Sequence, residues 1–190
     1  MSLLINRSKK WGYLHIPKTG GTSISSVLTE IEGTKTIIVH DSIRAFNNIE
    51  DYFIFTIVRN PFTRLASAFF HEKRNGRHGY DFHNFLKNIN QNDLVILPQS
   101  YYINAGSTEN KKVSFIAKYE SYETDVSYIF DKIGVTASIP HLNRNPIYDK
   151  HPNIKQEDFY KFLYKENWTR EWVRERYEND FKIFNYDMDI

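Results

Sequence analysis

Apolar and polar positions along the chain predict strands and helices that follow one another in turn. The apolar run at residues 51–58, which includes YFIFTIV, is almost continuous, and this is typical of a central parallel strand covered on both faces. Shorter apolar runs predict strands at residues 10–16, 35–39 and 112–119, whereas residues 1–9 are expected to be a frayed start. Helical patterns fall at residues 22–31, 61–73, 80–89, 123–133, 156–164 and 169–181.

This alternation predicts an α/β fold in which helices flank a central parallel β-sheet, because right-handed crossovers join parallel strands. The chain of 190 residues suits one domain over residues 1–190, with neither a repeat nor a low-complexity linker. Ligands of such sheets bind beyond the carboxyl ends of the strands. We therefore expect functional side chains where the strands end.

The end of the first predicted strand carries a glycine-containing turn. Residues 15–23 read HIPKTGGTS, with an apolar run before them and a helical pattern after them. Adjacent glycines let a ligand approach the backbone closely, and N–H groups of such a turn at a helix start attract anions. Lys18 adds a positive charge, and Thr22 and Ser23 add hydroxyl groups. This is not a Walker A loop, because the lysine precedes the glycines; the alternative is an ordinary loop with Thr22 as N-cap.

A second polar cluster follows the central strand, where residues 58–67 read VRNPFTRLAS. Asn60 is a good N-cap and Pro61 suits the first helical position. Arg59 leaves the strand at its carboxyl end, and Ser67 lies two turns into the helix. A guanidinium with a hydroxyl is a good receptor for a phosphate dianion. Arg64 is either part of this receptor or a structural ion-pair partner, and the alternative for Ser67 is a small residue packed on the sheet.

Composition narrows the class of protein further. Hydrophobic residues make up 41% of the chain and aromatic residues 16%, which indicates a packed globule, and a net charge of +2 gives no general attraction to nucleic acid. Without cysteine, the chain has neither disulfides nor thiolate metal sites nor a cysteine nucleophile. Neither a membrane-spanning apolar run nor a signal-peptide pattern is seen, so we expect a soluble, cytoplasmic protein. Oligomeric state is not readable from the sequence.

The two polar motifs together resemble the cofactor motifs of sulfotransferases that use 3′-phosphoadenosine 5′-phosphosulfate (PAPS). The likeness is greatest to the carbohydrate branch that includes heparan-sulfate 2-O-sulfotransferases and small bacterial relatives, and it extends to residues 118–120, 139–143 and 176–186. It implies a P-loop-like fold, PAPS as co-substrate and no metal. By position, the 5′-phosphosulfate would be held by Lys18, Thr19, Gly20, Gly21, Thr22 and Ser23. Arg59 and Ser67 would hold the 3′-phosphate.

Sulfuryl transfer, by analogy with phosphoryl transfer, depends mainly on positioning and charge stabilisation. Lys18 would neutralise charge on the leaving phosphate, and a base with a pKa near neutrality would take the acceptor proton. His40 is the candidate base because it follows the second predicted strand. In the resembling enzymes the catalytic histidine also lies between the two motifs, in a His-x-Ser context like His40-Asp41-Ser42. Alternatively, His40 is a strand-end histidine bonded to backbone, and Asp41 orients or replaces it.

Several other residues have two interpretations. The basic segment at residues 73–79 is either a channel for an acidic glycan or a solvated loop, and His141 with Asn143 lies in a loop that would close over the nucleotide. His15 is expected to shape the glycine turn. The spacing of His71, His78 and His83 is compatible with metal binding but favours solvated histidines. Near-helical spacing predicts core positions at Trp168, Trp172, Val173, Tyr177, Phe181 and Phe184.

The sequence therefore predicts transfer of a sulfuryl group from PAPS to a hydroxyl acceptor, with a carbohydrate as the expected acceptor. An ATP-dependent kinase of related architecture is one alternative. Two features of the sequence count against a kinase: it has no Walker A loop and no evident acidic magnesium ligand. A non-catalytic nucleotide- or glycan-binding module is the other alternative.

Overall fold

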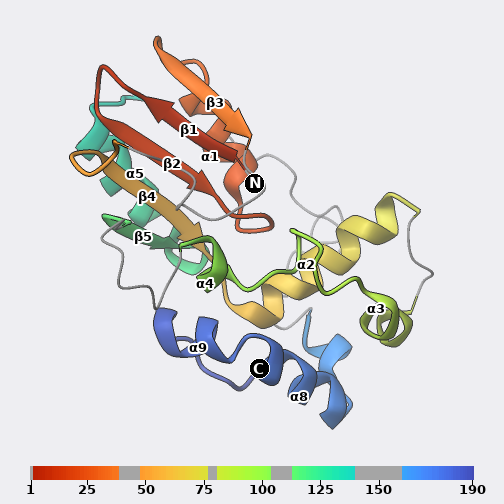
Figure 1. Ribbon diagram of the computed structural model, residues 1–190. Helices are drawn as coiled ribbons and strands as arrows, with labels where there is room; N and C mark the ends of the chain where they lie inside the picture. The colour runs from red at the N-terminus through yellow and green to blue at the C-terminus, as the bar shows by residue number, and fades with distance from the viewer. Residues whose placement is uncertain (1, 39–47, 77–80, 104–112, 140–159) are drawn as a thin grey trace. The chain divides into compact units, whose positions relative to one another are not determined.

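The computed structural model describes residues 2–38, 48–76, 81–103, 113–139 and 160–190 (Figure 1). Its elements in chain order are β1 (Ser2–Asn6), β2 (Trp11–His15), α1 (Gly21–Leu28), β3 (Thr34–Ile38), β4 (Phe53–Val58), α2 (Pro61–Arg74), α3 (Phe82–Asn88), α4 (Gln99–Tyr102), β5 (Phe115–Lys118), the 3-10 turn η2 (Tyr119–Ser121), α5 (Tyr122–Ile133), the 3-10 turn η3 (Phe162–Tyr164), α8 (Asn167–Arg176) and α9 (Glu178–Phe184).

The described strands form one mixed sheet in the order β3-β1-β2-β4-β5 (Figure 1). Strands β2, β4 and β5 are parallel, as predicted, but β1 is antiparallel to both of its neighbours. The expectation of a purely parallel sheet is therefore wrong. The reason is the short link between β1 and β2, since so few residues allow only a hairpin and not a crossover.

The first strand also corrects the expectation of a frayed start at residues 1–9. Leu3, Leu4 and Ile5 of β1 are at most 2% exposed, and β1 lies between β2 and β3 in the sheet. Because β3 is antiparallel to β1, it runs in the same direction as β2. Both His15 at the end of β2 and Ile38 at the end of β3 pair with Ser2. The carboxyl ends of β2 and β3 thus lie at the same edge of the sheet, with β1 between them.

The chain divides into two compact units. The first comprises residues 1–59 and 99–143, and the second comprises residues 60–98 and 144–190. A single domain over residues 1–190 stays a prediction. None of the described helices has the length and apolar character needed to cross a lipid bilayer.

In the first unit, α1 and α5 pack their apolar residues against the sheet. Strand β2 contributes Trp11 and Tyr13, and β4 contributes Phe55 and Ile57; in each strand the two residues are two positions apart and so face the same side. These side chains are buried with Ile24 and Leu28 of α1 and with Val126, Ile129, Phe130 and Ile133 of α5. This core fixes the end of β2, and so the start of the glycine turn.

The second unit is helical in its described residues. Asn60 caps α2 by accepting a hydrogen bond from the Phe62 N–H at 2.9 Å, and Pro61 occupies the first turn, as predicted. The expected aromatic core is confirmed: Val173, Tyr177 and Phe181 are buried in the cluster built on α2, with Trp168 and Trp172 packed against it. The helix expected at residues 169–181 is instead two helices, since the backbone leaves helical geometry at Tyr177.

Candidate anion-binding site

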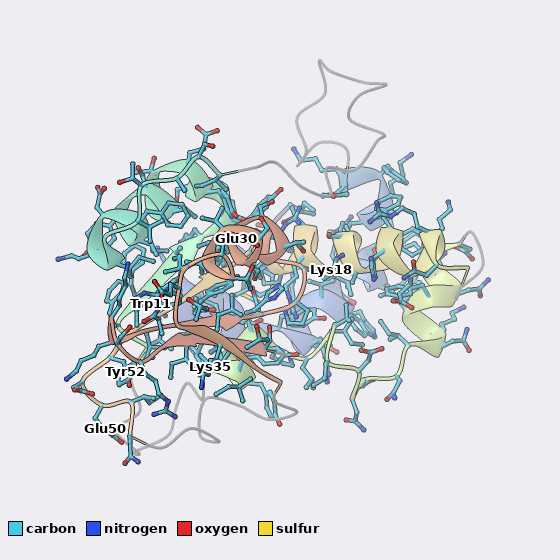
Figure 2. All side chains as sticks on the ribbon, turned by 90° about the horizontal axis from the view of Figure 1, so that it is seen from above. Trp11, Lys18, Glu30, Lys35, Glu50 and Tyr52 are labelled. Atoms are coloured by element: carbon cyan, nitrogen blue, oxygen red, sulfur yellow. The ribbon has the colours of Figure 1, made fainter. Side chains whose placement is uncertain are left out.

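The glycine loop, defined here as residues 18–23, connects β2 to α1 in the first unit. Figure 2 labels Lys18 on this loop and Trp11 at the opposite end of β2. The loop is tight because the buried Thr19 hydroxyl donates a hydrogen bond to the Ile16 carbonyl at 2.9 Å. Both Lys18, with φ +68°, and Gly20, with φ +83°, adopt left-handed backbone conformations. For a lysine this conformation costs about 1 kcal/mol, and such strain gathers at functional sites.

Each of the two glycines faces side chains that leave no room for a Cβ atom. A Cβ on Gly20 would lie 2.9 Å from ring atoms of Tyr119 and 3.2 Å from the ring of Tyr122. A Cβ on Gly21 would lie 2.3 Å from the His15 ring and 2.5 Å from the Tyr13 hydroxyl oxygen. Adjacent glycines therefore let the loop pass between aromatic side chains of β2 on one side and of η2 and α5 on the other.

Helix α1 begins directly at the loop, with Gly20 as its N-cap. The alternative in which Thr22 caps the helix is therefore wrong, because Thr22 already lies in the first turn. Gly20 has no side chain to cap the helix, and the first N–H groups of a helix have no partner within it. The dipole of the helix favours an anion at this end. Thr22 is exposed beside it, and Ser23 is 7% exposed.

Arg59, at the end of β4, lies against the glycine loop. Its guanidinium is 4.1 Å from the centre of the Tyr119 ring, and Nη1 donates to the Lys18 carbonyl at 3.4 Å. The Gln99 side chain forms two hydrogen bonds with the backbone of Arg59. Gln99 Oε1 accepts from the Arg59 N–H, and Gln99 Nε2 donates to the Arg59 carbonyl, each at 2.8 Å. Arg59 is only 4% exposed. The structure thus brings two of the predicted cationic residues, Lys18 and Arg59, to one loop.

The aromatic groups beneath the loop, the buried Tyr13 and the partly buried His15, carry perturbed pKa values. Burial, reinforced by the positive charges of the N-terminal amino group and of Lys18, lowers the pKa of His15 to about 4, so its ring is neutral at neutral pH. The His15 ring stacks on Tyr13 at 5.7 Å, and burial raises the pKa of Tyr13 well above its usual value. The Tyr13 hydroxyl is buried and has no hydrogen-bond partner among the described residues. A neutral, packed His15 supports the expectation that it shapes the loop.

The remaining residues of the second motif belong to the second unit. Ser67 is partly buried in α2, so the structure does not bring it together with Arg59 in one unit. Arg64 is 2% exposed and donates to the carbonyls of Leu97 at 2.9 Å and Val95 at 3.0 Å. These bonds connect α2 to the segment before α4. Of the two interpretations of Arg64, these bonds to carbonyl groups favour a structural role.

Some predicted residues lie outside the described residues, namely His40, Asp41, Ser42, His78, His141 and Asn143. Their roles stay predictions. His71 contacts the Asn75 amide at 3.2 Å, and His83 lies 3.5 Å from Glu166. Among the residues that the structure describes, no group of three or more histidine or carboxylate side chains is arranged to hold a metal ion.

The second unit contains a pocket of about 310 Å³ at the end of α2 and the start of α3. Its lining combines apolar side chains with three charged or titratable ones. The apolar lining residues are Phe69, Phe70, Phe82, Phe162 and Leu163, and the charged or titratable ones are Lys73, Asp81 and His83. Lys73 opens the basic segment at residues 73–79, so part of that segment borders a cavity. Both interpretations of the segment remain open.

Sequence reasoning did not single out Tyr122 or Gln99. The Tyr122 hydroxyl donates to the Gly20 carbonyl at 3.2 Å across 102 residues of chain, and Gln99 reaches Arg59 across 40 residues. In the sequence, Tyr119 belongs only to the resembling segment at residues 118–120. No local pattern signals such pairs, because they depend on how β4 and β5 are placed in the sheet.

The fold and the loop define an α/β protein with a glycine loop between a strand and a helix, a candidate anion-binding site. The chain matches the model of the sulfotransferase family over residues 1–187, and it belongs to that family. It is 23% identical over 228 residues to carbohydrate sulfotransferase 10 of Rattus norvegicus and to that of Mus musculus. Carbohydrate sulfotransferase 10 of Xenopus laevis is also 23% identical, over 229 residues.

Each of these alignments covers 92% of this chain and 64% of the relative. The chain therefore spans less than two thirds of the length of the curated relatives that it matches. No solved structure matches the chain significantly.

Proposed function

We propose that this protein is a PAPS-dependent sulfotransferase that acts on a hydroxyl group of a saccharide. The observation that carries the proposal is the contact of Arg59 with the glycine loop, in a chain that belongs to the sulfotransferase family. Two positive charges, a helix start and paired glycines meet in one unit, and these are the features that an anionic donor needs.

The donor carries a phosphosulfate at the 5′ position and a phosphate at the 3′ position. Lys18, Thr19, Gly20, Gly21, Thr22 and Ser23 would bind the 5′ end. Because the Thr19 hydroxyl proton is donated to the Ile16 carbonyl, Thr19 would contribute through its backbone N–H. Arg59 and Ser67 would bind the 3′-phosphate.

In the transfer step, the acceptor oxygen forms a bond to sulfur while the bond from sulfur to the bridging phosphate oxygen breaks. Lys18 would stabilise the negative charge that collects on that phosphate. His40 would take the proton of the acceptor hydroxyl, with Asp41 orienting or replacing it. The shared sheet edge of β2 and β3 supports this role, because His40 follows β3 by two residues and the glycine loop follows β2.

A saccharide acceptor is supported by the relatives, which are named as carbohydrate sulfotransferases. A hydroxyl group suits a histidine base, since its proton must be removed as the oxygen attacks sulfur. We expect neither a metal ion nor nucleic acid as a partner in this reaction.

The donor assignment is tested by titrating the protein with 3′,5′-ADP, 5′-AMP and ATP. We expect 3′,5′-ADP to bind at least about tenfold more tightly than 5′-AMP, because only it offers the second phosphate to charged donors. Ser67→Ala should reduce this preference, whereas Thr29→Ala, at the other end of α1, should leave it unchanged. Equal affinities for 3′,5′-ADP and 5′-AMP would contradict the roles of Arg59 and Ser67.

The reaction is tested by incubating PAPS with a panel of saccharides and detecting sulfated products by mass spectrometry. Lys18→Ala and His40→Ala should each abolish most of the transfer, and unchanged turnover in His40→Ala would exclude it as the base. Magnesium-dependent ATP consumption would favour the kinase alternative. Tight binding of 3′,5′-ADP with no transfer to any acceptor would favour a binding module.

A further inference from the structure

Two tyrosines that follow β5 enclose the glycine loop, although they lie about a hundred residues after it in the chain. Tyr119 in η2 and Tyr122 at the start of α5 have ring centres 6.0 Å apart, and Gly20 packs against both rings. Each tyrosine is partly buried. All three residues belong to the first unit.

Tyr122 controls the direction of one peptide plane of the loop. Its hydroxyl donates to the Gly20 carbonyl at 3.2 Å. In a planar trans peptide the carbonyl and the next N–H point in opposite directions, so the Gly21 N–H is aimed away from Tyr122. Burial raises the pKa of Tyr122 to about 12, which keeps the hydroxyl protonated and able to donate at any physiological pH.

Tyr119 acts on a second peptide plane through Arg59. The guanidinium lies over the Tyr119 ring, and its Nη1 donates to the Lys18 carbonyl. By the same geometry, the Thr19 N–H is aimed away from Arg59. A cation held against an aromatic face is favoured electrostatically, so the ring restricts where the guanidinium lies.

The segment that carries the two tyrosines is itself fixed. The Asp125 carboxylate accepts hydrogen bonds from the Lys118 N–H at 2.7 Å and from the Ser121 hydroxyl at 2.8 Å. These bonds tie the end of β5 and η2 to the first turn of α5. Both tyrosines therefore lie on a short turn that is restrained by hydrogen bonds to Asp125.

We propose that Tyr122 and the Tyr119–Arg59 pair are positioning residues that hold the Gly20 and Lys18 carbonyls, and so aim the Gly21 and Thr19 N–H groups at the donor's anionic group. The donor in this inference is that of the proposed function. The orientation of the loop, however, is a property of the protein alone and is measurable without any donor.

The first test measures backbone chemical shifts of the loop, residue by residue, by NMR without any donor. Tyr122→Phe removes only the hydroxyl and should shift the Gly20 carbonyl 13C and Gly21 amide 15N resonances, because the Gly20 carbonyl loses a hydrogen-bond donor. Tyr119→Leu should shift the corresponding resonances of the Lys18 carbonyl and the Thr19 amide, and Tyr119→Phe should restore them because the ring is kept. The matched control is Tyr128→Phe on the same helix, where the ring packs on Phe115 at 4.7 Å; neither loop amide should change.

The second test measures affinity for nucleotides. Tyr122→Phe should weaken 3′,5′-ADP and 5′-AMP by the same factor, about fivefold, because the 5′ group is common to both. Tyr128→Phe should bind both as the wild type does. A general loss of packing would instead lower the melting temperature, so this temperature is measured for every variant.

The outcomes separate this inference from the proposed function. Wild-type resonances at Gly20 and Gly21 in Tyr122→Phe, or at Lys18 and Thr19 in Tyr119→Leu, would overturn the positioning role. Shifted resonances in both variants, combined with wild-type protein that fails to bind 3′,5′-ADP, would overturn the proposed function and retain the positioning of the loop. Shifted resonances together with matched losses of affinity support both.

Discussion

At the scale of single residues, Lys18 combines a favourable charge with an unfavourable backbone. Its φ of +68° lies in the left-handed region, which lysine rarely adopts. The surrounding contacts over-determine this conformation, since the Lys18 carbonyl accepts from Arg59 and the next residue closes the turn through the Ile16 carbonyl. The lysine is therefore kept at this position at a cost in stability, which fits a role in binding or catalysis.

Lys18→Asn should separate the stability cost of the left-handed backbone at this position from the effect of the lysine charge on donor binding. Asparagine tolerates left-handed backbone better than lysine or alanine, so the variant should be about 0.5–1 kcal/mol more stable than Lys18→Ala. Both variants should lose donor binding, because both lose the ammonium group. Chemical unfolding and a 3′,5′-ADP titration measure the two effects, and equal stability of the two variants would show that the position carries no strain.

At the scale of elements, strand β1 shows where sequence reasoning falls short. A short apolar run at the start of a chain is easily taken for a frayed end, because one strand of five residues has too few alternations to identify it. Its burial depends on β3, which follows it by almost thirty residues. By contrast, the cap of α2 by Asn60 and the end of α5 at Gly134 were predictable, because caps are local signals.

Leu4→Ala tests whether β1 is a structural strand. Leu4 is 2% exposed in the core of the first unit, so the variant should lose about 2–4 kcal/mol of unfolding free energy. Ile37→Ala on the edge strand β3, where the side chain is 36% exposed, is the control and should cost well under half as much. A cost for Leu4→Ala as small as that for Ile37→Ala would mean that the start of the chain is frayed after all.

At the scale of the whole molecule, the sequence predicted the family and the loop, but not the contacts that hold the loop. HIPKTGGTS predicts an anion-binding turn because glycine pairs and a following helix are local features. The partners of that turn come from β2, β4 and η2, which the sheet order β1-β2-β4-β5 brings together. One of these contacts, the packing of His15 beneath Gly21, links the loop to the stability of the fold and to pH.

His15 should make the protein less stable as the pH falls from 6.5 toward 4. Its pKa is about 4 when folded, against an ordinary value of 6.5, so the unfolded chain binds a proton first. The stability that a neutral His15 provides is thus complete above pH 6.5 and is lost progressively as the pH falls from 6.5 to 4. Between pH 7 and pH 4.5 this amounts to about 2 kcal/mol.

The measurement compares urea unfolding of wild type and His15→Gln at several pH values in this range. Glutamine does not titrate. Between pH 7 and pH 4.5 the wild type should therefore lose about 2 kcal/mol more unfolding free energy than His15→Gln. Carboxylates titrate equally in both proteins and cancel in the difference. A difference between wild type and His15→Gln that stays constant with pH would mean that His15 keeps an ordinary pKa and that the space beneath Gly21 is open to water.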